Sequence, residues 1–242
     1  MGIDVWVERE PTRVDLINIE PESPLSKSIN EVSSLEESLV ENPTATTSIL
    51  AEHSLETLDW QELRSVVSKC QACELSKVRK QTVFGEGSQT ASFMIIGDVP
   101  SEEDDQHGQI LSGEAGKLLT AMLKAMGYQR NDVYISNIVK CRTTLNQDPT
   151  ENETVACAPY LLRQIKLLQP RLILALGTVA AQRLLKSKST MARLRGQLHY
   201  SDGIDAPILV SYHPAYLLRA PNEKRKAWDD LQMAMKELGL TR

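Results

Sequence analysis

Short apolar runs alternate with longer amphipathic segments from residue 92 to residue 238, and no other feature restricts the fold as strongly. Four apolar runs are predicted to be strands, at residues 92–96, 132–136, 171–176 and 207–211. Apolar residues at helical spacing predict helices at residues 115–126, 153–168, 178–185 and 224–238. Strands that alternate with helices form parallel sheets covered on both faces. The sequence therefore predicts an α/β fold, a three-layer α/β/α arrangement around a central four-stranded parallel sheet.

The first 58 residues differ from this body in composition. They are rich in Ser, Thr, Glu, Pro and Asn, and twelve acidic against three basic side chains give them a net charge of −9, whereas the remainder carries +4. Such a segment buries too little apolar surface to offset the entropy of ordering. We expect a disordered acidic tail at residues 1–58 and one folded domain at residues 59–242. The mildly basic domain is compatible with nucleic-acid binding.

The sequence also predicts the cellular compartment of the protein. It contains no run near the roughly 20 apolar residues that a membrane helix needs, and its first residues do not resemble a signal peptide. We therefore expect a cytoplasmic protein. In that compartment, four cysteines are expected to be thiols, metal ligands or redox groups rather than disulfides.

Four residues stand at the ends of the predicted strands: Asp98, Asn137, Gly177 and His213. In parallel sheets, ligands bind outside the carboxyl ends of the strands. An acid, an amide and an imidazole at one edge predict a site for a polar, planar ligand. The alternative is that these residues only form turns after the strands, because all four residue types are common in turns.

The four cysteines lie in the predicted domain, as Cys70-x2-Cys73, then Cys141, then Cys157 after fifteen residues. A Cys-x2-Cys pair lets two thiolates reach one metal site from a single turn. Four thiolates suit either zinc or an iron–sulfur cluster, and the spacing lacks the second Cys-x2-Cys pair of a typical zinc ribbon. The remaining alternative is four unrelated buried cysteines.

Residues 62–240 resemble the family 4 uracil-DNA glycosylases, which are 4Fe–4S enzymes. The elements that carry the resemblance occur in the family's order: Cys70-Gln71-Ala72-Cys73, Gly97-Asp98-Val99-Pro100 with Glu103-Asp104-Asp105, Gly113-Glu114-Ala115-Gly116-Lys117, Asn137-Ile138-Val139-Lys140-Cys141-Arg142, Cys157 with Pro159-Tyr160-Leu161, Ala175-Leu176-Gly177, Leu194-Arg195-Gly196, and His213-Pro214-Ala215-Tyr216-Leu217-Leu218-Arg219. The resemblance implies the same fold and a [4Fe–4S] cluster on the four cysteines. It also implies that the protein binds uracil-containing DNA, single- or double-stranded, and excises uracil in base-excision repair.

The resemblance further implies a role for each pocket residue. Asn137 matches the amide that reads the flipped base, and an amide can donate to O4 and accept from N3–H, which separates uracil from cytosine. His213 matches the histidine that donates to O2 as the base departs. Asp98 stands where the family's carboxylate positions water or steadies the sugar cation. Gly97 and Leu111 complete the implied uracil-binding positions.

DNA contacts are implied at Arg195 and at Leu217, Leu218 and Arg219. The last three match a loop that enters the duplex beside the flipped base, as apolar wedges do in other proteins. The alternative is that Leu217 and Leu218 pack under their own loop.

The pocket departs from the family pattern at three places. The family's glutamate is Asp98, which is one methylene shorter, and its stacking phenylalanine is Leu111, which covers a base without the roughly 1–3 kcal/mol of aromatic stacking. Thr143 and Thr144 replace the usual prolines after Cys141-Arg142. These changes predict weak, altered or lost catalysis on an intact scaffold.

The first seven residues, Met1 to Val7, resemble the N-terminal peptide of the psi subunit of the bacterial DNA polymerase III clamp-loader complex, which binds the chi subunit. Tryptophan is a typical interface anchor, so residues 1–10 are a possible docking peptide, with Ile3 and Trp6 as docking residues. Two hypotheses follow. The chain is a weak uracil-DNA glycosylase, which we favour, or a non-catalytic replisome adaptor that binds chi through its tail.

Overall fold

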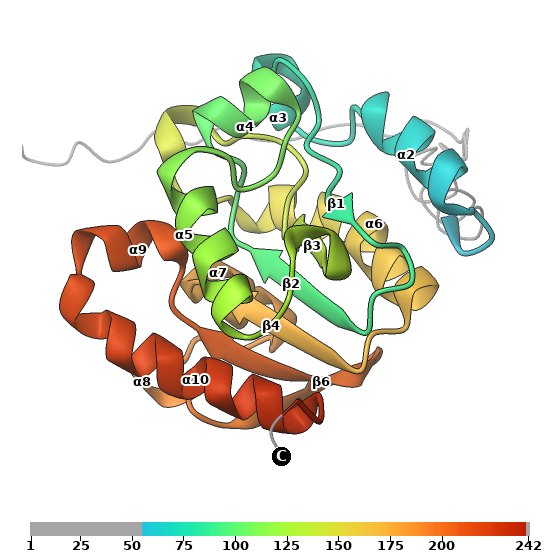
Figure 1. The fold of residues 1–242 in the computed structure, drawn as a ribbon. Helices are drawn as coiled ribbons and strands as arrows, with labels where there is room; N and C mark the ends of the chain where they lie inside the picture. The colour runs from blue at the N-terminus through green and yellow to red at the C-terminus, as the bar shows by residue number, and fades with distance from the viewer. Residues whose placement is uncertain (1–54, 241–242) are drawn as a thin grey trace, which may run out of the picture. The chain divides into compact units, whose positions relative to one another are not determined.

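The computed structural model describes residues 55–240, and a mixed six-stranded sheet forms its centre (Figure 1). The strands are β1 (Glu86–Gly87), β2 (Phe93–Gly97), β3 (Tyr134–Asn137), β4 (Leu172–Leu176), β5 (Leu198–Ser201) and β6 (Ile204–Ser211). Their order across the sheet is β1-β3-β2-β4-β6-β5. The four middle strands run parallel, and each edge strand is antiparallel to its neighbour.

The predicted α/β fold and its four parallel strands are confirmed, but the predicted number of strands is wrong. Both missed strands lie at the edges and lack a buried apolar run. β1 has only two residues, one of which is exposed, and no residue of β5 is buried. A short turn through Asp202 and Gly203, with φ of 82° at Gly203, joins β5 to β6. Asp-Gly between two strands is a hairpin signal that indicates this edge.

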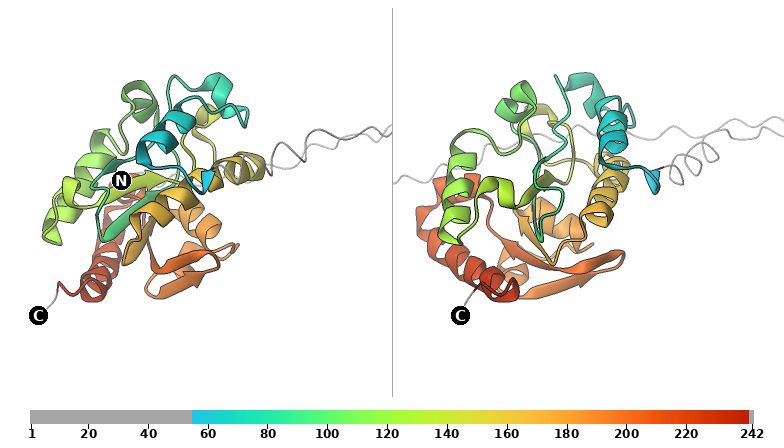
Figure 2. Two further views of the ribbon diagram at one scale, coloured as in Figure 1. Left: turned by 90° about the vertical axis from the view of Figure 1, so that its right-hand side faces the viewer. Right: turned by 45° about the vertical axis from the view of Figure 1, so that its right-hand side comes forward.

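The helices connect the strands and cover both faces of the sheet (Figures 1 and 2). They are α2 (Trp60–Ser68), α3 (Leu75–Val78), α4 (Glu102–His107), α5 (Gly113–Ala125), α6 (Glu151–Leu168), α7 (Thr178–Leu184), α8 (Met191–Leu194), α9 (Pro214–Arg219) and α10 (Lys224–Glu237), with 3-10 turns at Arg130–Asp132, Thr144–Asn146 and Pro221–Glu223. No helix among residues 55–240 is both long and apolar enough to cross a bilayer.

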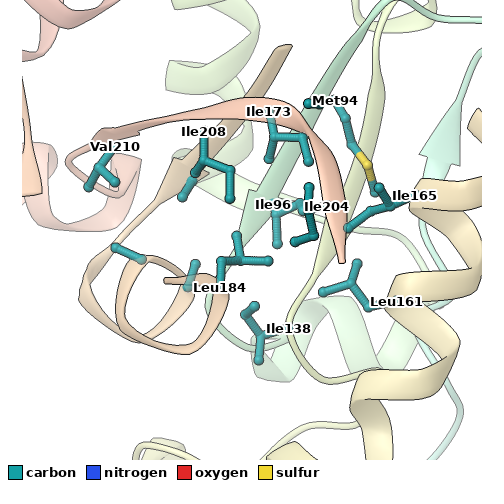
Figure 3. Close-up of a cluster of buried hydrophobic side chains, with 14 of the residues drawn as sticks. Met94, Ile96, Ile138, Leu161, Ile165, Ile173, Leu184, Ile204, Ile208 and Val210 are labelled. Carbon is teal, nitrogen blue, oxygen red and sulfur yellow. The ribbon is translucent and has the colours of Figure 1, made fainter. Parts of the chain in front are cut away.

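Alternate side chains of the strands enter two separate hydrophobic cores, because successive residues of a strand face opposite sides. On β2, Met94 and Ile96 pack with α6 and α7 (Figure 3), whereas Phe93 and Ile95 pack with α5 and α10. All five residues of β2 and of β4 are buried. Continuous apolar runs are typical of parallel strands covered on both faces, and this explains why the sequence reveals these strands clearly.

Helix α2 fixes the start of the described body and leads into the first cysteine. Asp59 caps it by accepting from the N–H groups of Gln61 and Glu62, while the Glu62 side chain accepts from the N–H of Asp59. Trp60 packs on Tyr134 of β3, with 4.9 Å between ring centroids. The helix therefore attaches the segment before Cys70 to the sheet.

Candidate active site and four-cysteine site

The strand register brings the predicted site residues to one edge of the sheet. Gly97 at the end of β2 is the register partner of Asn137 on β3 and of Leu176 on β4. Leu176 is in turn the partner of Ser211 on β6. Gly177 follows β4 directly and His213 lies two residues beyond the end of β6, as the sequence predicts for the carboxyl ends of a parallel sheet.

The Asn137 and His213 side chains converge on Gly97. A Cβ atom at position 97 would lie 2.6 Å from Asn137 Oδ1 and 3.7 Å from His213 Nε2. Both polar atoms of the Asn137 amide and Nε2 of His213 are buried, and none has a hydrogen-bond partner. Because buried polar groups are nearly always paired, three unpaired atoms beside one glycine indicate a site for a polar ligand.

The surroundings of His213 define its protonation. Its Nδ1 accepts from the N–H of Ala215 at 3.2 Å, at the start of α9. Burial lowers the pKa of His213 to about 4, and this effect outweighs the opposing influence of Asp104. The imidazole is therefore neutral near pH 7, and its single proton lies on Nε2. The site thus offers a neutral N–H donor beside an amide that can donate and accept.

Asp98 lies beside the same edge and accepts from the N–H of Ala180 at 2.7 Å. Its carboxylate also lies against Gly177, where φ is 108° and an added Cβ would be 2.1 Å from Asp98 Oδ2. Burial raises the pKa of Asp98 to about 7, although the helix N–H groups lower it. The close approach of the carboxylate explains why glycine stands at position 177.

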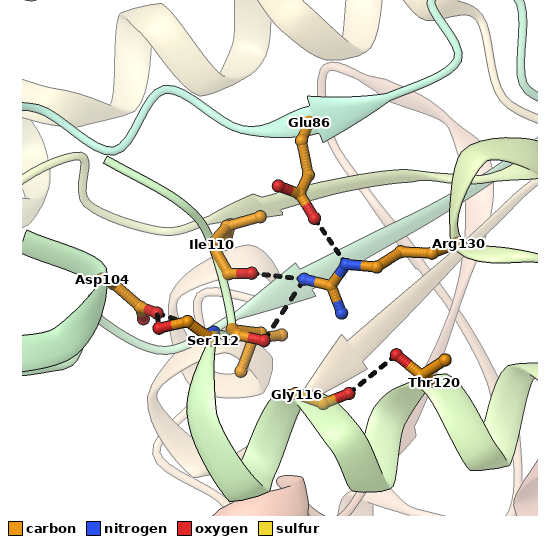
Figure 4. Close-up of polar contacts among 8 residues, drawn as sticks. Glu86, Asp104, Ile110, Ser112, Gly116, Thr120 and Arg130 are labelled. Carbon is orange, nitrogen blue, oxygen red and sulfur yellow. Dashed lines mark hydrogen bonds and ion pairs between the residues drawn. The ribbon is translucent and has the colours of Figure 1, made fainter. Parts of the chain in front are cut away.

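Two polar clamps hold the loop that carries Leu111 (Figure 4). Asp104 accepts from the N–H of Ser112 at 2.8 Å and from its hydroxyl at 2.5 Å. Arg130 donates to the carbonyls of Ile110 and Leu111 and pairs with Glu86 at 2.5 Å. Leu111 itself has a φ of 46°, which is uncommon for a non-glycine residue. The clamps therefore hold a strained backbone beside the site.

The Leu111 side chain is buried and belongs to the hydrophobic core formed with α5 and α10. Gly116 of α5 is required beneath it, because an added Cβ would lie 1.7 Å from the Leu111 carbonyl oxygen. The role of Leu111 in covering a base stays a prediction.

The predicted DNA-contacting residues separate into two groups. The segment predicted to be a DNA-contacting loop is helix α9, on which Leu217 is 1% exposed, whereas Leu218 is 41% exposed and Arg219 is also exposed. Arg195 forms a two-point ion pair with the buried Asp230 at 2.9 and 3.1 Å and lies over the Tyr212 ring. Its guanidinium is therefore committed to the fold, which does not support the prediction that it contacts DNA.

The four cysteines line one small pocket, together with Val67, Ala72, Thr82, Lys140, Ala156 and Tyr160. None of the four forms a disulfide. Hydrogen-bond donors surround the sulfur atoms. Cys141 accepts from Arg79 Nη1 at 3.0 Å, Cys157 from the N–H of Lys140 at 3.3 Å, and Cys70 from the Tyr160 hydroxyl at 3.4 Å.

No three His, Cys, Asp or Glu side chains within residues 55–240 are placed to hold a single metal ion. Hydrogen bonds to sulfur are typical of iron–sulfur sites, so the donors at three of the four sulfur atoms are compatible with a cluster.

Four residues that shape the site have no role assigned from the sequence: Arg79, Asp104, Arg130 and Lys140. Asp104 alone had a clear local signal. Ser101-x-x-Asp104 is a capping-box pattern, and the structure contains this box at the start of α4. Arg79 and Arg130 act across long sequence separations, and Lys140 bonds both to its near neighbours Ser136 and Asn137 and to the distant Gln164, which no local pattern reveals. The predicted docking residues, Ile3 and Trp6, lie outside the described residues.

The comparisons with known proteins agree with this geometry. Residues 84–232 match the model of the uracil DNA glycosylase superfamily. A type-4 uracil-DNA glycosylase of Pyrobaculum aerophilum is 37% identical over 182 residues, which cover 73% of this chain and 93% of that protein. One from Thermotoga maritima is 38% identical (72% and 94% covered), and one from Saccharolobus solfataricus is 39% identical (71% and 83% covered).

Proposed function

Since this chain belongs to the type-4 family of the uracil-DNA glycosylase superfamily, we propose that it excises uracil from DNA by hydrolysing the N-glycosidic bond. One observation carries the proposal: the unpaired amide of Asn137 and the unpaired Nε2 of His213 are buried side by side at Gly97. A flipped uracil presents O4, N3–H and O2 along one edge, which matches one donor, one acceptor and a second donor.

The two side chains have different parts in the reaction. The Asn137 amide donates to O4 and accepts from N3–H, so it binds uracil in preference to cytosine, which offers a donor at position 4 and an acceptor at N3. His213 donates from Nε2 to O2. Negative charge develops on the base as the glycosidic bond breaks, and a fixed donor in a buried site stabilises that charge. A neutral imidazole can do this without the cost of burying a cation.

Asp98 supplies the negative charge of the site when it is ionised. The carboxylate orients the attacking water or steadies the positive charge that develops on the sugar. The hydrogen bond that it accepts from the N–H of Ala180 fixes the orientation of the carboxylate for this role. Leu111 would cover the base, and the exposed Leu218 and Arg219 would contact the DNA around the flipped nucleotide.

We also propose that Cys70, Cys73, Cys141 and Cys157 hold a [4Fe–4S] cluster. When bound, the cluster would supply a rigid connection between the segment after α2, the segment after β3, and α6. Lys140 and Tyr160 of the pocket lining, together with Arg79, supply donors to three of the four sulfur atoms.

A single-turnover assay with excess protein on a uracil-containing oligonucleotide tests the proposal. We expect weak excision by the wild type, and a loss of about 10²–10³-fold in His213→Ala, since removal of one oxyanion donor has an effect of this size. His107→Ala is the matched control, because His107 is exposed and bonds only to its own helix. No product from cluster-loaded wild type would overturn the proposal.

The adaptor hypothesis receives no support from the relatives described above, which are glycosylases. Its docking residues lie outside residues 55–240, so binding to chi stays an untested prediction.

A further inference from the structure

Lys140 is a lysine whose side chain is almost completely enclosed by the fold, with 1% exposure. It lies three residues beyond Asn137, between the base site and the four-cysteine site. Its Nζ donates to the Asn137 carbonyl at 3.1 Å, to Gln164 Oε1 at 2.7 Å and to Ser136 Oγ. An ammonium group has three donors and no acceptor, so this arrangement of three acceptors fits the charged form.

The acceptors belong to a larger buried network, which holds the ammonium in one place. Ser136 donates to Gln164 Oε1 at 2.9 Å, and the Gln164 amide donates to the Phe84 carbonyl at 2.9 Å and to the Tyr134 hydroxyl at 3.1 Å. The network therefore connects β3, α6 and the segment before β1.

The acceptors of Lys140 are all uncharged, which leaves its charge to be balanced elsewhere. None of the ion pairs among residues 55–240 includes Lys140. Lys140 also borders the cysteine site: Cys141 is its neighbour in the chain, its backbone N–H donates to Cys157 Sγ at 3.3 Å, and it lines the pocket that contains the four cysteines. Buried charges are normally paired, so thiolates at these two positions would be the counter-charge.

We propose that Lys140 is a positioning residue that couples the cysteine site to the base pocket: thiolates that hold the cluster balance its ammonium, which in turn fixes the Asn137 carbonyl. This inference rests on the proposed function of Asn137. The base-reading amide depends on the backbone at the end of β3, and Lys140 provides that backbone with a charged hydrogen bond. The cluster then contributes to base recognition without touching the DNA.

The decisive variant is Lys140→Met, in the full chain with its cluster, because methionine keeps an unbranched side chain but removes the ammonium. The matched control is Lys166→Met, which removes an exposed lysine on α6 that pairs only at the surface with Glu56. The probe is an oligonucleotide with one 2′-fluorinated deoxyuridine, which resists cleavage, compared with the same oligonucleotide carrying thymidine. The ratio of the two dissociation constants isolates base recognition from backbone binding.

We expect Lys140→Met to retain the visible absorption of the cluster and its affinity for the thymidine oligonucleotide. The preference for uracil should fall roughly tenfold to a hundredfold, as for a lost hydrogen bond to a charged group. The reduction potential of the cluster should also fall, because the loss of a nearby positive charge disfavours the added electron. A packing role alone would leave the potential unchanged.

Wild-type uracil preference together with a wild-type potential in Lys140→Met would overturn the inference. A wild type that itself shows no preference for uracil would instead contradict the proposed function, while the potential still tests Lys140. If Lys140→Met does not fold, Ser136→Ala removes one of the three acceptors. It should then lower the preference for uracil by a smaller factor, and an unchanged preference in folded Ser136→Ala would refute the coupling.

Discussion

The carboxylate of Asp98 accepts a hydrogen bond from the N–H of Ala180 at 2.7 Å, in the first turn of α7. The bond holds a half-buried acid at the carboxyl edge of the sheet, beside the neutral His213. The two side chains have pKa values displaced in opposite directions, to about 7 for Asp98 and about 4 for His213, and burial is the main cause of both shifts. Titratable groups with opposed shifts are characteristic of catalytic sites.

The first prediction is that excision depends on pH through Asp98. The ionised carboxylate is needed, so the single-turnover rate should rise between pH 6 and pH 8 and level off above the pKa of about 7. His213 stays neutral throughout this range. Asp98→Asn should show little activity at any of these pH values. A wild-type rate that is flat from pH 5 to pH 8 would contradict the role given to Asp98.

A second prediction concerns stability, because the same pKa shift makes folding depend on pH. Between pH 3.8 and about 7 the folded protein keeps a proton on Asp98 that the unfolded chain releases. This contribution to stability is therefore lost as the pH rises through the window. Asp98→Asn removes this effect. The free energy of unfolding of Asp98→Asn minus that of the wild type should therefore be larger at pH 8 than at pH 5, by up to about 3 kcal/mol.

The measurement is denaturant unfolding of wild type and Asp98→Asn at both pH values. His213 acts in the opposite direction, because a lowered pKa makes stability fall as the pH falls below 6.5. The two slopes partly cancel in the wild type, so the variant-minus-wild-type difference is the quantity to compare. A difference that does not change with pH would refute the raised pKa of Asp98.

The third prediction is that Asp98→Glu with Leu111→Phe raises the excision rate. The first change restores the longer acid, and the second restores the stacking ring, which can stabilise a flipped base by about 1–3 kcal/mol. Each single variant should give a smaller increase than the pair in the same assay. Since Leu111 has a φ of 46° and is clamped by Arg130, Arg130→Met is a useful comparison. It should lower the activity of the double variant, because the loop that carries residue 111 would be released.

The parallel core and the polar residues at its edge could be predicted from sequence, because both follow from local pattern. Runs such as Phe93–Gly97 are apolar throughout, and Asn137 and His213 stand at the ends of two of the strands. The coupling between distant segments could not be predicted. Arg130 lies 44 residues from Glu86, and Lys140 lies 24 residues from Gln164. Only the folded chain brings these partners together.

Arg195 is a residue for which the sequence predicts a contact that the structure does not support. Its position in a family motif predicts a DNA contact, but the sequence gives no sign of the buried acid 35 residues later that binds its guanidinium. Exposure also separates Leu217 from Leu218, although the two are identical in sequence terms.

The fourth prediction concerns the metal. The purified protein should be brown, with absorption near ~400 nm and about four iron atoms per chain, because four cysteines line one pocket. Cys141→Ser should lose colour and solubility, since the cluster connects separate segments of the body. Metal analysis by mass spectrometry decides the matter, and a colourless protein with one zinc per chain would overturn the assignment of the cluster.

The last prediction separates Arg195 from Arg219, which the sequence analysis treats alike. Asp230 is 1% exposed and accepts two hydrogen bonds from Arg195 and one from the Ser211 hydroxyl at 2.8 Å. Arg195→Ala leaves a buried carboxylate without its cation, so the free energy of unfolding should fall by about 3–5 kcal/mol. Arg195→Ala with Asp230→Asn should recover part of that loss, because the unpaired buried charge is gone.

Arg219 is exposed, so Arg219→Ala should leave the unfolding midpoint unchanged. It should weaken binding to both uracil and thymidine oligonucleotides, with a shallower dependence of affinity on salt. Denaturant unfolding and fluorescence anisotropy on the four proteins test both statements. If Arg195→Ala and Arg219→Ala lose DNA affinity equally and both keep wild-type stability, Arg195 contacts DNA and this prediction is wrong.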